Sequence, residues 1–281
     1  MNILALDTSM GACSAAVLCT TDSTHRLHVL QAEMARGHAE ALMPMVEEVL
    51  GEAEIDACDL DLIAATTGPG SFTGVRIAIA AARGLALVTK ARLYGTDSLA
   101  VMARAARLAG LEPKGPFAVA VDARRDMLYL GLYDQTGSRL EGPLLIAPDD
   151  AAGLLPATLR LAVGNGARSL CDAAVTRGRK IEIELPSLQP SVAALAEIAL
   201  ERGATSETVR PLYLRPPDAK PQLPPSRGTD AAHDHRHPGW LFRPHLHGRD
   251  PPQLFRKGLG RSGDGTISRF SGDALPDRLG R

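Results

Sequence analysis

Residues 64–76, Ala64-Ala-Thr-Thr-Gly-Pro-Gly-Ser-Phe-Thr-Gly-Val-Arg76, join a predicted strand to a predicted helix through a glycine-rich turn. The apolar run 60–66 is typical of a buried strand, and the apolar segment 72–89 has the length of a helix. Gly68 and Gly70 suit backbone angles that other residues resist. Such a turn before a helix N-terminus is typical of anion-binding loops. No Gly-Lys-Ser/Thr follows the glycines, however, so the turn lacks the lysine of a P-loop.

The predicted helix 72–89 carries a stripe of small residues. Ser71 or Thr73 can cap its N-terminus. Small residues recur every four positions and therefore lie on one side of the helix; they are Gly74, Ala78, Ala82 and Ala86. Because small side chains let another helix approach closely, we interpret this stripe as a docking surface.

Charge is unevenly distributed along the 281 residues. The formal net charge is −1, but residues 221–281 hold nine Arg, one Lys and six Asp, which leaves residues 1–220 at −5. The larger part is thus mildly acidic and shows no basic face for nucleic acid. If the chain serves RNA chemistry, another protein is expected to supply the RNA contacts.

The cysteines and the N-terminus predict a cytoplasmic protein. Cys13, Cys19, Cys58 and Cys171 form no C-x-x-C pair and are typical of reduced, buried thiols. The N-terminal apolar run stops at Asp7 without a basic segment before it, which is unlike a signal peptide. The longest apolar stretch, 75–88, is interrupted by charge and is too short to be predicted as a membrane span.

The order of the predicted elements indicates a duplicated α/β fold. Strands are predicted at 2–6, 13–18 and 25–33, and again at 117–121, 127–133 and 140–146. An aspartate, Asp7 or Asp122, closes the first strand of each set. Helices and strands then alternate in both halves, which predicts two similar lobes, 1–108 and 109–220. The other predicted elements are helices 37–50, 98–108, 150–159, 168–175 and 192–201, and strands 92–95, 161–163 and 180–184.

Composition changes sharply after Lys220. Residues 221–281 hold eight Pro, nine Gly and five of the eight His, and they show no strand or helix period. Such a segment buries too little apolar surface to offset its ordering entropy. We therefore predict a disordered tail over 221–281, dispensable for folding, in which Trp240 is exposed to solvent.

Few side chains suggest chemistry. The turn Asp7-Thr8-Ser9 could hold a metal-nucleotide or be a plain strand exit. A metal site of the i, i+4 kind at His38 would need a second ligand at position 42, which is Leu42. The charged turn at 122–126 could clamp an acidic ligand or be a solvated hairpin end. The tail histidines could capture metal adventitiously.

Four segments resemble the TsaB family, the dimerisation subunits of the bacterial threonylcarbamoyladenosine machinery. They are Ile3-Leu-Ala-Leu-Asp-Thr-Ser9, Gly37-His-Ala-Glu40, Thr67-Gly-Pro-Gly-Ser-Phe-Thr-Gly-Val-Arg76 and Val121-Asp-Ala-Arg124. Residues 209–215 look like the C-terminal strand of the family. The resemblance covers about residues 1–218 and matches in order and spacing.

The resemblance implies an actin/sugar-kinase/Hsp70 (ASKHA) fold of two duplicated lobes. It implies a non-catalytic paralogue that pairs with a TsaD-like catalytic subunit and works with a TsaE-like ATPase on tRNA. Alone, the chain is expected to form a homodimer. The metal-binding histidine pair of TsaD does not carry over because position 42 is leucine. We expect no cofactor of the chain's own, with ATP or ADP held by or with the partner subunits, and no peptidase or transferase activity.

The predicted partner interface is a four-helix packing of helices 38–50 and 72–88 against the equivalent pair of a partner. Its residues are His38, Leu42, Met45, Val46, Val49, Gly74, Ala78, Ala82 and Ala86, some of which could instead be core. Ala78→Arg with Ala82→Arg is expected to abolish pairing and leave the monomer folded. The family motifs, as vestigial nucleotide loops, are Asp7, Thr8, Ser9, Gly68, Pro69, Gly70, Ser71, Phe72, Thr73, Arg76 and Asp122.

Two other functions remain open. One is a nucleotide-binding ASKHA phosphotransferase that uses Asp7 and the glycine turn, which tight ATP–Mg²⁺ binding by the isolated chain would favour. The other is a tRNA-binding module that works through the Arg-rich tail, which salt-dependent tRNA binding lost with residues 221–281 would favour.

Overall fold

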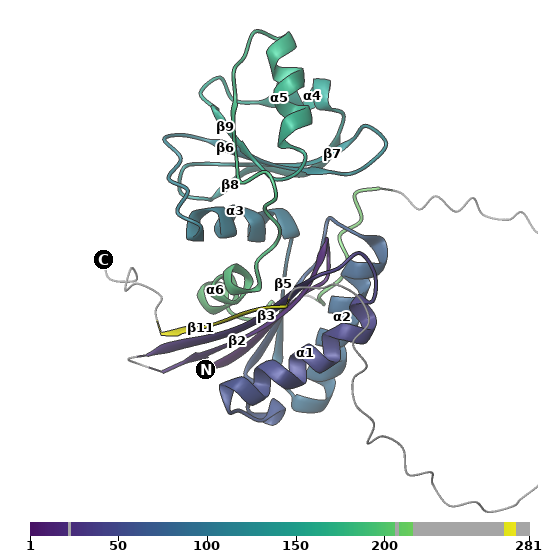
Figure 1. Cartoon of the computed structure of the whole chain (residues 1–281), viewed down its shortest axis with the longest axis vertical. Helices are drawn as coiled ribbons and strands as arrows, with labels where there is room; N and C mark the ends of the chain where they lie inside the picture. The colour runs from purple at the N-terminus through teal and green to yellow at the C-terminus, as the bar shows by residue number, and fades with distance from the viewer. Residues whose placement is uncertain (22–23, 206–207, 216–266, 274–281) are drawn as a thin grey trace, which may run out of the picture. The chain divides into compact units, whose positions relative to one another are not determined.

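Two mixed β-sheets organise the chain in the computed structural model, which describes residues 1–21, 24–205, 208–215 and 267–273 (Figure 1). The first sheet has six strands: β11 (Ile267–Asp273), β3 (His25–Glu33), β2 (Ala12–Thr20), β1 (Asn2–Asp7), β4 (Leu62–Thr66) and β5 (Arg92–Thr96). β1, β2 and β3 form an antiparallel meander, and β4 and β5 run parallel to β1.

The second sheet repeats this plan. Its strands, in order, are β10 (Glu182–Glu184), β9 (Leu161–Val163), β6 (Phe117–Asp122), β7 (Leu128–Tyr133) and β8 (Arg139–Ile146). β6, β7 and β8 form the meander, and β9 and β10 are parallel to β6. The prediction of a duplicated, two-lobed α/β fold is confirmed.

Alternate residues of the strands enter different layers of the core, as the pleat of a strand requires. In β1, Leu4 and Leu6 pack with α1 (His38–Ala53) and α2 (Phe72–Thr89), whereas Ile3 and Ala5 pack with α6 (Val192–Arg202) on the opposite face. The second sheet packs one face on α4 (Pro148–Leu154) and α5 (Ala167–Thr176). The first turn of α2 is capped as predicted, since Gly74 N donates to Ser71 Oγ at 3.2 Å.

Helix α3 (Ser98–Leu108) belongs to both cores. Its Val101 and Ala105 pack on the first sheet with α6, and its Met102 and Ala106 pack on the second sheet. Helix α6 packs on the first sheet as well. The predicted division at 108/109 instead places it in the second lobe. The helix packs on the first sheet because its apolar side completes the core over β1, β2 and β4.

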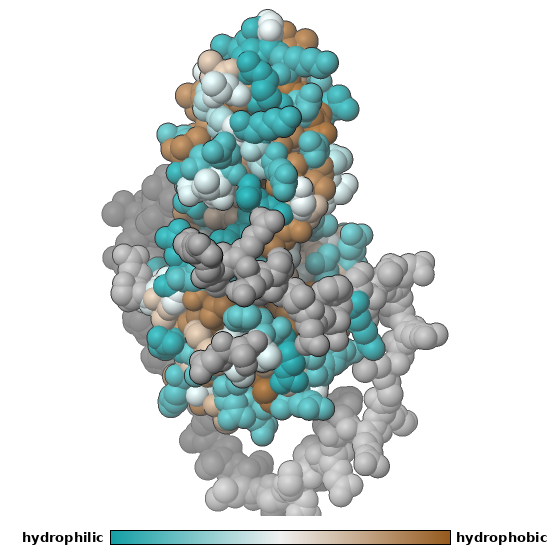
Figure 2. Space-filling model, turned by 90° about the vertical axis from the view of Figure 1, so that its left-hand side faces the viewer, coloured by the Kyte–Doolittle hydropathy of each residue, from teal (hydrophilic) through white to brown (hydrophobic). Residues whose placement is uncertain are grey.

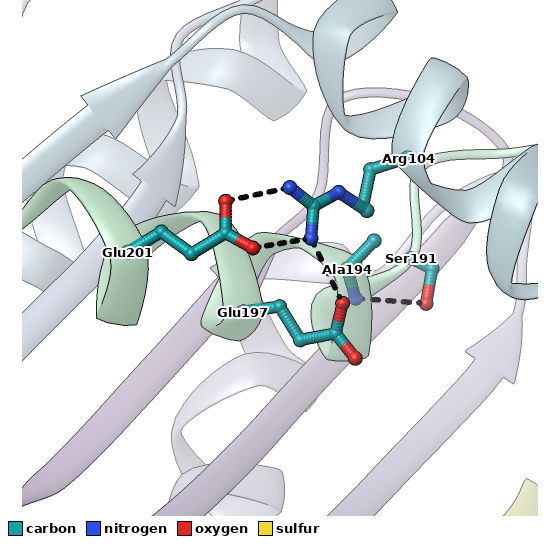
Figure 3. A network of polar contacts seen from close by, with 5 residues as sticks. All are labelled: Arg104, Ser191, Ala194, Glu197 and Glu201. Atoms are coloured by element: carbon teal, nitrogen blue, oxygen red, sulfur yellow. Dashed lines mark hydrogen bonds and ion pairs between the residues drawn. The ribbon is translucent and has the colours of Figure 1, made fainter. Parts of the chain in front are cut away.

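An arginine on α3 binds two carboxylates on α6 (Figure 3). Arg104 donates to both oxygens of Glu201, at 2.7 and 2.6 Å, and to Glu197 Oε2 at 3.2 Å. Hydrogen bonds from Arg104 lower the pKa of Glu201, whereas burial raises the pKa of Glu197. The bidentate pair links the two helices, because both guanidinium donors meet one carboxylate plane.

The tail prediction is wrong for seven residues. Residues 267–273 form β11, which pairs antiparallel with β3, although the sequence shows no strand period there. Backbone groups on the outer edge of β3 bond to any extended segment, so pairing there needs no apolar alternation. The rest of the predicted tail, with Trp240 and its histidines, lies outside the described residues.

One smaller prediction, the C-terminal strand, also fails. Residues 209–215 form no strand; instead, Leu212 N donates to Thr67 O at 2.7 Å and ties this segment to the end of β4. The 18 residues of α2 are long and apolar enough, by length and composition alone, for a membrane span. In this fold α2 is the crossover between the parallel strands β4 and β5, and it packs Val75, Ala78, Ile79 and Ala82 inward.

Candidate functional site

The turn after β1 is pressed against the start of α2. Thr8 Oγ1 donates to Gly74 O at 2.6 Å and accepts from Ala78 N at 3.1 Å. Ser71 N donates to Ser9 O at 2.7 Å. Thr8 and Ser9 are fully buried. The turn and the helix therefore satisfy one another's polar groups, and these amides and hydroxyls are already engaged.

Three motif glycines have separate structural reasons. A Cβ on Gly74 would lie 1.9 Å from Thr8 O, and one on Gly70 would lie 2.2 Å from Ser9 O. Gly68, before Pro69, has a φ of 93°, the left-handed region that glycine favours. The backbone-angle prediction is thus confirmed for Gly68, whereas Gly70 is needed for close approach. The glycine turn brings the helix onto the Asp7 turn.

Asp7 lies in the interior beneath this contact. Its Oδ1 accepts from Ser9 Oγ at 2.7 Å, from Ser9 N at 3.3 Å and from Thr66 Oγ1. Burial raises the pKa of Asp7, and the hydrogen bonds from Thr66 and Ser9 oppose that rise. Ser98 Oγ donates to Ser9 Oγ at 3.1 Å and extends the network to α3. The carboxylate is thus bonded within the fold.

The corresponding turn of the second lobe is exposed. Asp122 N donates to Asn165 Oδ1 at 2.9 Å, and Asp122 Oδ1 accepts from Arg124 N at 2.8 Å. Arg124, Arg125 and Asp126 all have φ between 54° and 60°, a conformation that costs energy for residues with a side chain. Arg215 Nη2 bonds Ala123 O at 3.1 Å and braces the turn. The duplication therefore gives one buried and one exposed aspartate.

The described residues hold no group of three or more His, Cys, Asp or Glu side chains with metal-site geometry. His38 is half-buried, its Nε2 has no hydrogen-bond partner, and Leu42 is in the core beneath α1. Burial raises the pKa of the Cys13 thiol to about 12, so this group stays protonated and unreactive.

The predicted partner interface is wrong for most of its residues. Those that are buried in the chain's own core are Leu42, Met45, Val46, Val49, Gly74, Ala78 and Ala82. Only His38 and Ala86 are half-exposed. The small stripe faces β1 and its turn because that is where α2 must approach the sheet most closely.

The opposite side of α2, its outer face, is exposed and combines apolar residues with two arginines. We define this outer face as Thr73, Arg76, Ala80, Arg83, Gly84, Leu87 and Val88, with Ile77 half-buried among them. Leu87 is 73% exposed and Val88 is 76% exposed. On the face drawn in Figure 2, hydrophilic residues predominate and hydrophobic residues gather in smaller groups between them. Among the described residues, no other segment buries Leu87 or Val88.

An aromatic cluster, which the sequence reasoning missed, lies at the N-terminal end of α2. The Arg76 guanidinium lies 3.5 Å from the centre of the Phe72 ring, and Arg76 Nε donates to the Tyr213 hydroxyl at 2.6 Å. The rings of Phe72 and Tyr213 are 5.5 Å apart. Phe72 and Arg76 in one motif and Tyr213 in another were the available signal, but nothing in their spacing shows that they meet.

Comparisons with known proteins agree with one another. A family model described as "TsaD: tRNA N6-adenosine threonylcarbamoyltransferase" matches residues 29–190. The "tRNA threonylcarbamoyladenosine biosynthesis protein TsaB" of Escherichia coli K12 is 31% identical over 241 residues, which cover 80% of this chain and 99% of that protein. The protein of the same name from Haemophilus influenzae is 36% identical over 129 residues, which cover 46% of this chain and 52% of the relative.

Solved structures give the same result. The structure described as "YeaZ from Pseudomonas aeruginosa" matches with a TM-score of 0.62 and 33% identity, over 76% of this chain and 99% of that one. A second Pseudomonas aeruginosa structure, described as an uncharacterized protein with similarity to peptidase YEAZ, has a TM-score of 0.63 and 33% identity with the same coverage.

Proposed function

The chain belongs to the TsaB family, and from that premise we propose that it is a non-catalytic pairing subunit in tRNA threonylcarbamoyladenosine biosynthesis. Its partner would be a TsaD-like transferase, which carries the chemistry on the adenosine beside the anticodon. A TsaE-like ATPase and the tRNA would join through the complex. We place this assembly in the cytoplasm, with any ATP or ADP held by or with the partner subunits.

The observation that carries the pairing role is the outer face of α2. Exposed aliphatic side chains such as Leu87 and Val88 gain free energy when a partner covers them, at about 25 cal/mol for each Å² of apolar surface buried. Ala80 and Gly84, between the ends of the helix, let a facing helix approach closely. In the absence of a transferase, the same surface supports a homodimer.

The Asp7 turn supports a non-catalytic role. Ser71 N donates to Ser9 O, and Thr8 Oγ1 is bonded to Gly74 O and Ala78 N, so these groups are already engaged within the fold. Leu42 stands where a second histidine ligand would be needed. The transferase chemistry therefore falls to the partner.

The first test introduces two negative charges on the outer face of α2. In Leu87→Asp with Val88→Asp, affinity for a TsaD-like transferase should fall about 100-fold or more, because two desolvated carboxylates oppose association. The measurement is isothermal calorimetry with the purified transferase. Leu154→Asp, on α4 and 51% exposed, is the matched control and should leave affinity unchanged. Unchanged affinity in a folded double variant would refute this surface.

The second test addresses catalysis. The chain alone, with threonylcarbamoyl-adenylate and tRNA, should give no modified adenosine, and addition of the transferase should restore turnover. Mass spectrometry of the digested tRNA measures the product. Turnover by the isolated chain would contradict the non-catalytic assignment.

A further inference from the structure

Exposed edge strands invite pairing with other chains, and proteins protect them in identifiable ways. Three of the sheet edges among the described residues carry such protection. β10 has only three residues, two of them glutamates. β8 contains Pro143 and shifts register against Leu130 and Leu132. Along β5, Thr205 N donates to Leu93 O at 2.9 Å, so a following segment lines that edge.

The outer edge of β3 lacks all of these devices. β3 has nine residues, contains no proline or glycine, and pairs with β2 in unbroken register from His25 to Glu33. Its charged residues, Arg26 and Glu33, lie near its ends, and Leu27, Val29 and Leu30 lie between them. This long, regular and partly apolar edge is the one that β11 covers, with seven residue pairs from Ile267–Ala32 to Asp273–Arg26.

A side-chain contact accompanies the backbone pairing. Arg269 lies opposite Leu30 in the register, and Leu30 belongs to the core layer beneath α1. Arg269 Nη2 lies 2.5 Å from Oε1 of Glu48 on α1. The ion pair favours this register of β11 on β3 over a register shifted by one residue. Such a shift would move the Arg269 side chain to the other face of the sheet, away from Glu48.

We propose that the outer edge of β3, together with Glu48, is a strand-acceptor site for an extended segment with an arginine opposite Leu30. Its occupant is residues 267–273 of the same chain. Because this segment is tethered, its effective concentration at the edge exceeds that of a free competitor. By covering β3, it keeps the edge from adding a strand of another protein or the β3 of a second copy. This role is independent of the proposed pairing through α2.

Cross-linking of the full chain tests occupancy and register. Gln31→Cys with Ser268→Cys joins two directly opposed residues, whose Cα spacing suits a disulfide. The exposed Cys58 is replaced by Ser in all variants. The control, Gln31→Cys with Gly272→Cys, is four residues out of register, about 13 Å along the strand. An intrachain disulfide is expected at monomer mass, with at least fivefold higher yield than the control. A disulfide at dimer mass, or equal yields, would overturn the proposal.

Charge reversal tests the ion pair. Arg269→Glu should accelerate amide hydrogen exchange in β3 about two- to fivefold, the range expected for an exposed pair. Adding Glu48→Arg should restore protection, whereas adding Glu47→Arg, an exposed position on the same helix, should not. If both Glu48→Arg and Glu47→Arg restored protection of β3, or if neither did, Glu48 would not be part of the acceptor site.

Discussion

The two faces of α2 carry similar small residues and have different roles. On the inner face, Gly74, Ala78 and Ala82 are buried, and Gly74 leaves no room for a Cβ beside Thr8. On the outer face, Ala80 and Gly84 are exposed, and nothing lies within 4 Å of a Cβ added to Gly84. Small residues on a helix therefore do not by themselves mark a contact, and on α2 burial shows which of them pack against the same chain.

The largest expected effect on stability comes from placing an arginine on the inner face of α2 rather than on its outer face. Ala78→Arg should unfold the chain, because it places an unpaired guanidinium in the core at a cost of about 4 kcal/mol or more. Ala80→Arg, two residues away and exposed, should leave the free energy of unfolding within about 0.5 kcal/mol of the original. Urea denaturation followed by circular dichroism measures both. A folded Ala78→Arg chain of unchanged stability would show that the inner face is not core.

The next largest loss of stability is expected at Gly74, where α2 approaches the Asp7 turn closely. Gly74→Ala should destabilise the fold by about 3 kcal/mol, because its Cβ would meet Thr8 O at 1.9 Å and either the helix or the turn must move. The same denaturation experiment measures it, and near-UV spectra report whether packing survives. A loss below about 0.5 kcal/mol would mean that α2 and the Asp7 turn are not in contact.

Much of the fold could be predicted from local pattern. The helix 98–108 and the strand 161–163 were predicted to the residue, and the aspartates that end β1 and β6 revealed the duplication. Apolar periodicity shows which elements exist, but not which sheet receives an element distant in sequence. That is why α6 was placed with the second lobe although it packs on the first sheet, and why β11, held by backbone pairing, was missed.

The candidate site was harder to predict for a related reason. The motif residues were identified, but the stripe of Ala78 and Ala82 was interpreted as a surface when it is core. A helix, a strand or a turn can each pack against a small residue. Only the fold shows that the Asp7 turn packs against the small residues of α2. Leu87 and Val88 were part of an apolar run whose exposed and buried members the sequence does not separate.

A smaller effect concerns the charge beneath the inner face. Burial raises the pKa of Asp7 above 3.8, so the folded chain holds this proton more tightly than the unfolded chain does. The contribution of Asp7 to stability is therefore greatest below pH 3.8 and falls as pH rises through the raised pKa. The stability of the original chain relative to Asp7→Asn should fall across that window, by about 1.4 kcal/mol for each unit between the two pKa values. Urea midpoints against pH measure it, and a relative stability that rises with pH would contradict burial.

The smallest effect is expected at Gly84, and it has opposite signs for folding and for pairing. Gly84→Ala should stabilise the free chain by about 0.5–1 kcal/mol, because alanine is the better helix former and the added methyl group meets nothing. A partner helix packed closely on the outer face would meet that methyl group, so affinity for the transferase should fall at the same time. Thermal denaturation and calorimetry on one variant measure both quantities. Lower stability would show that Gly84 already has a neighbour, and higher stability with unchanged affinity would place the partner elsewhere on the chain.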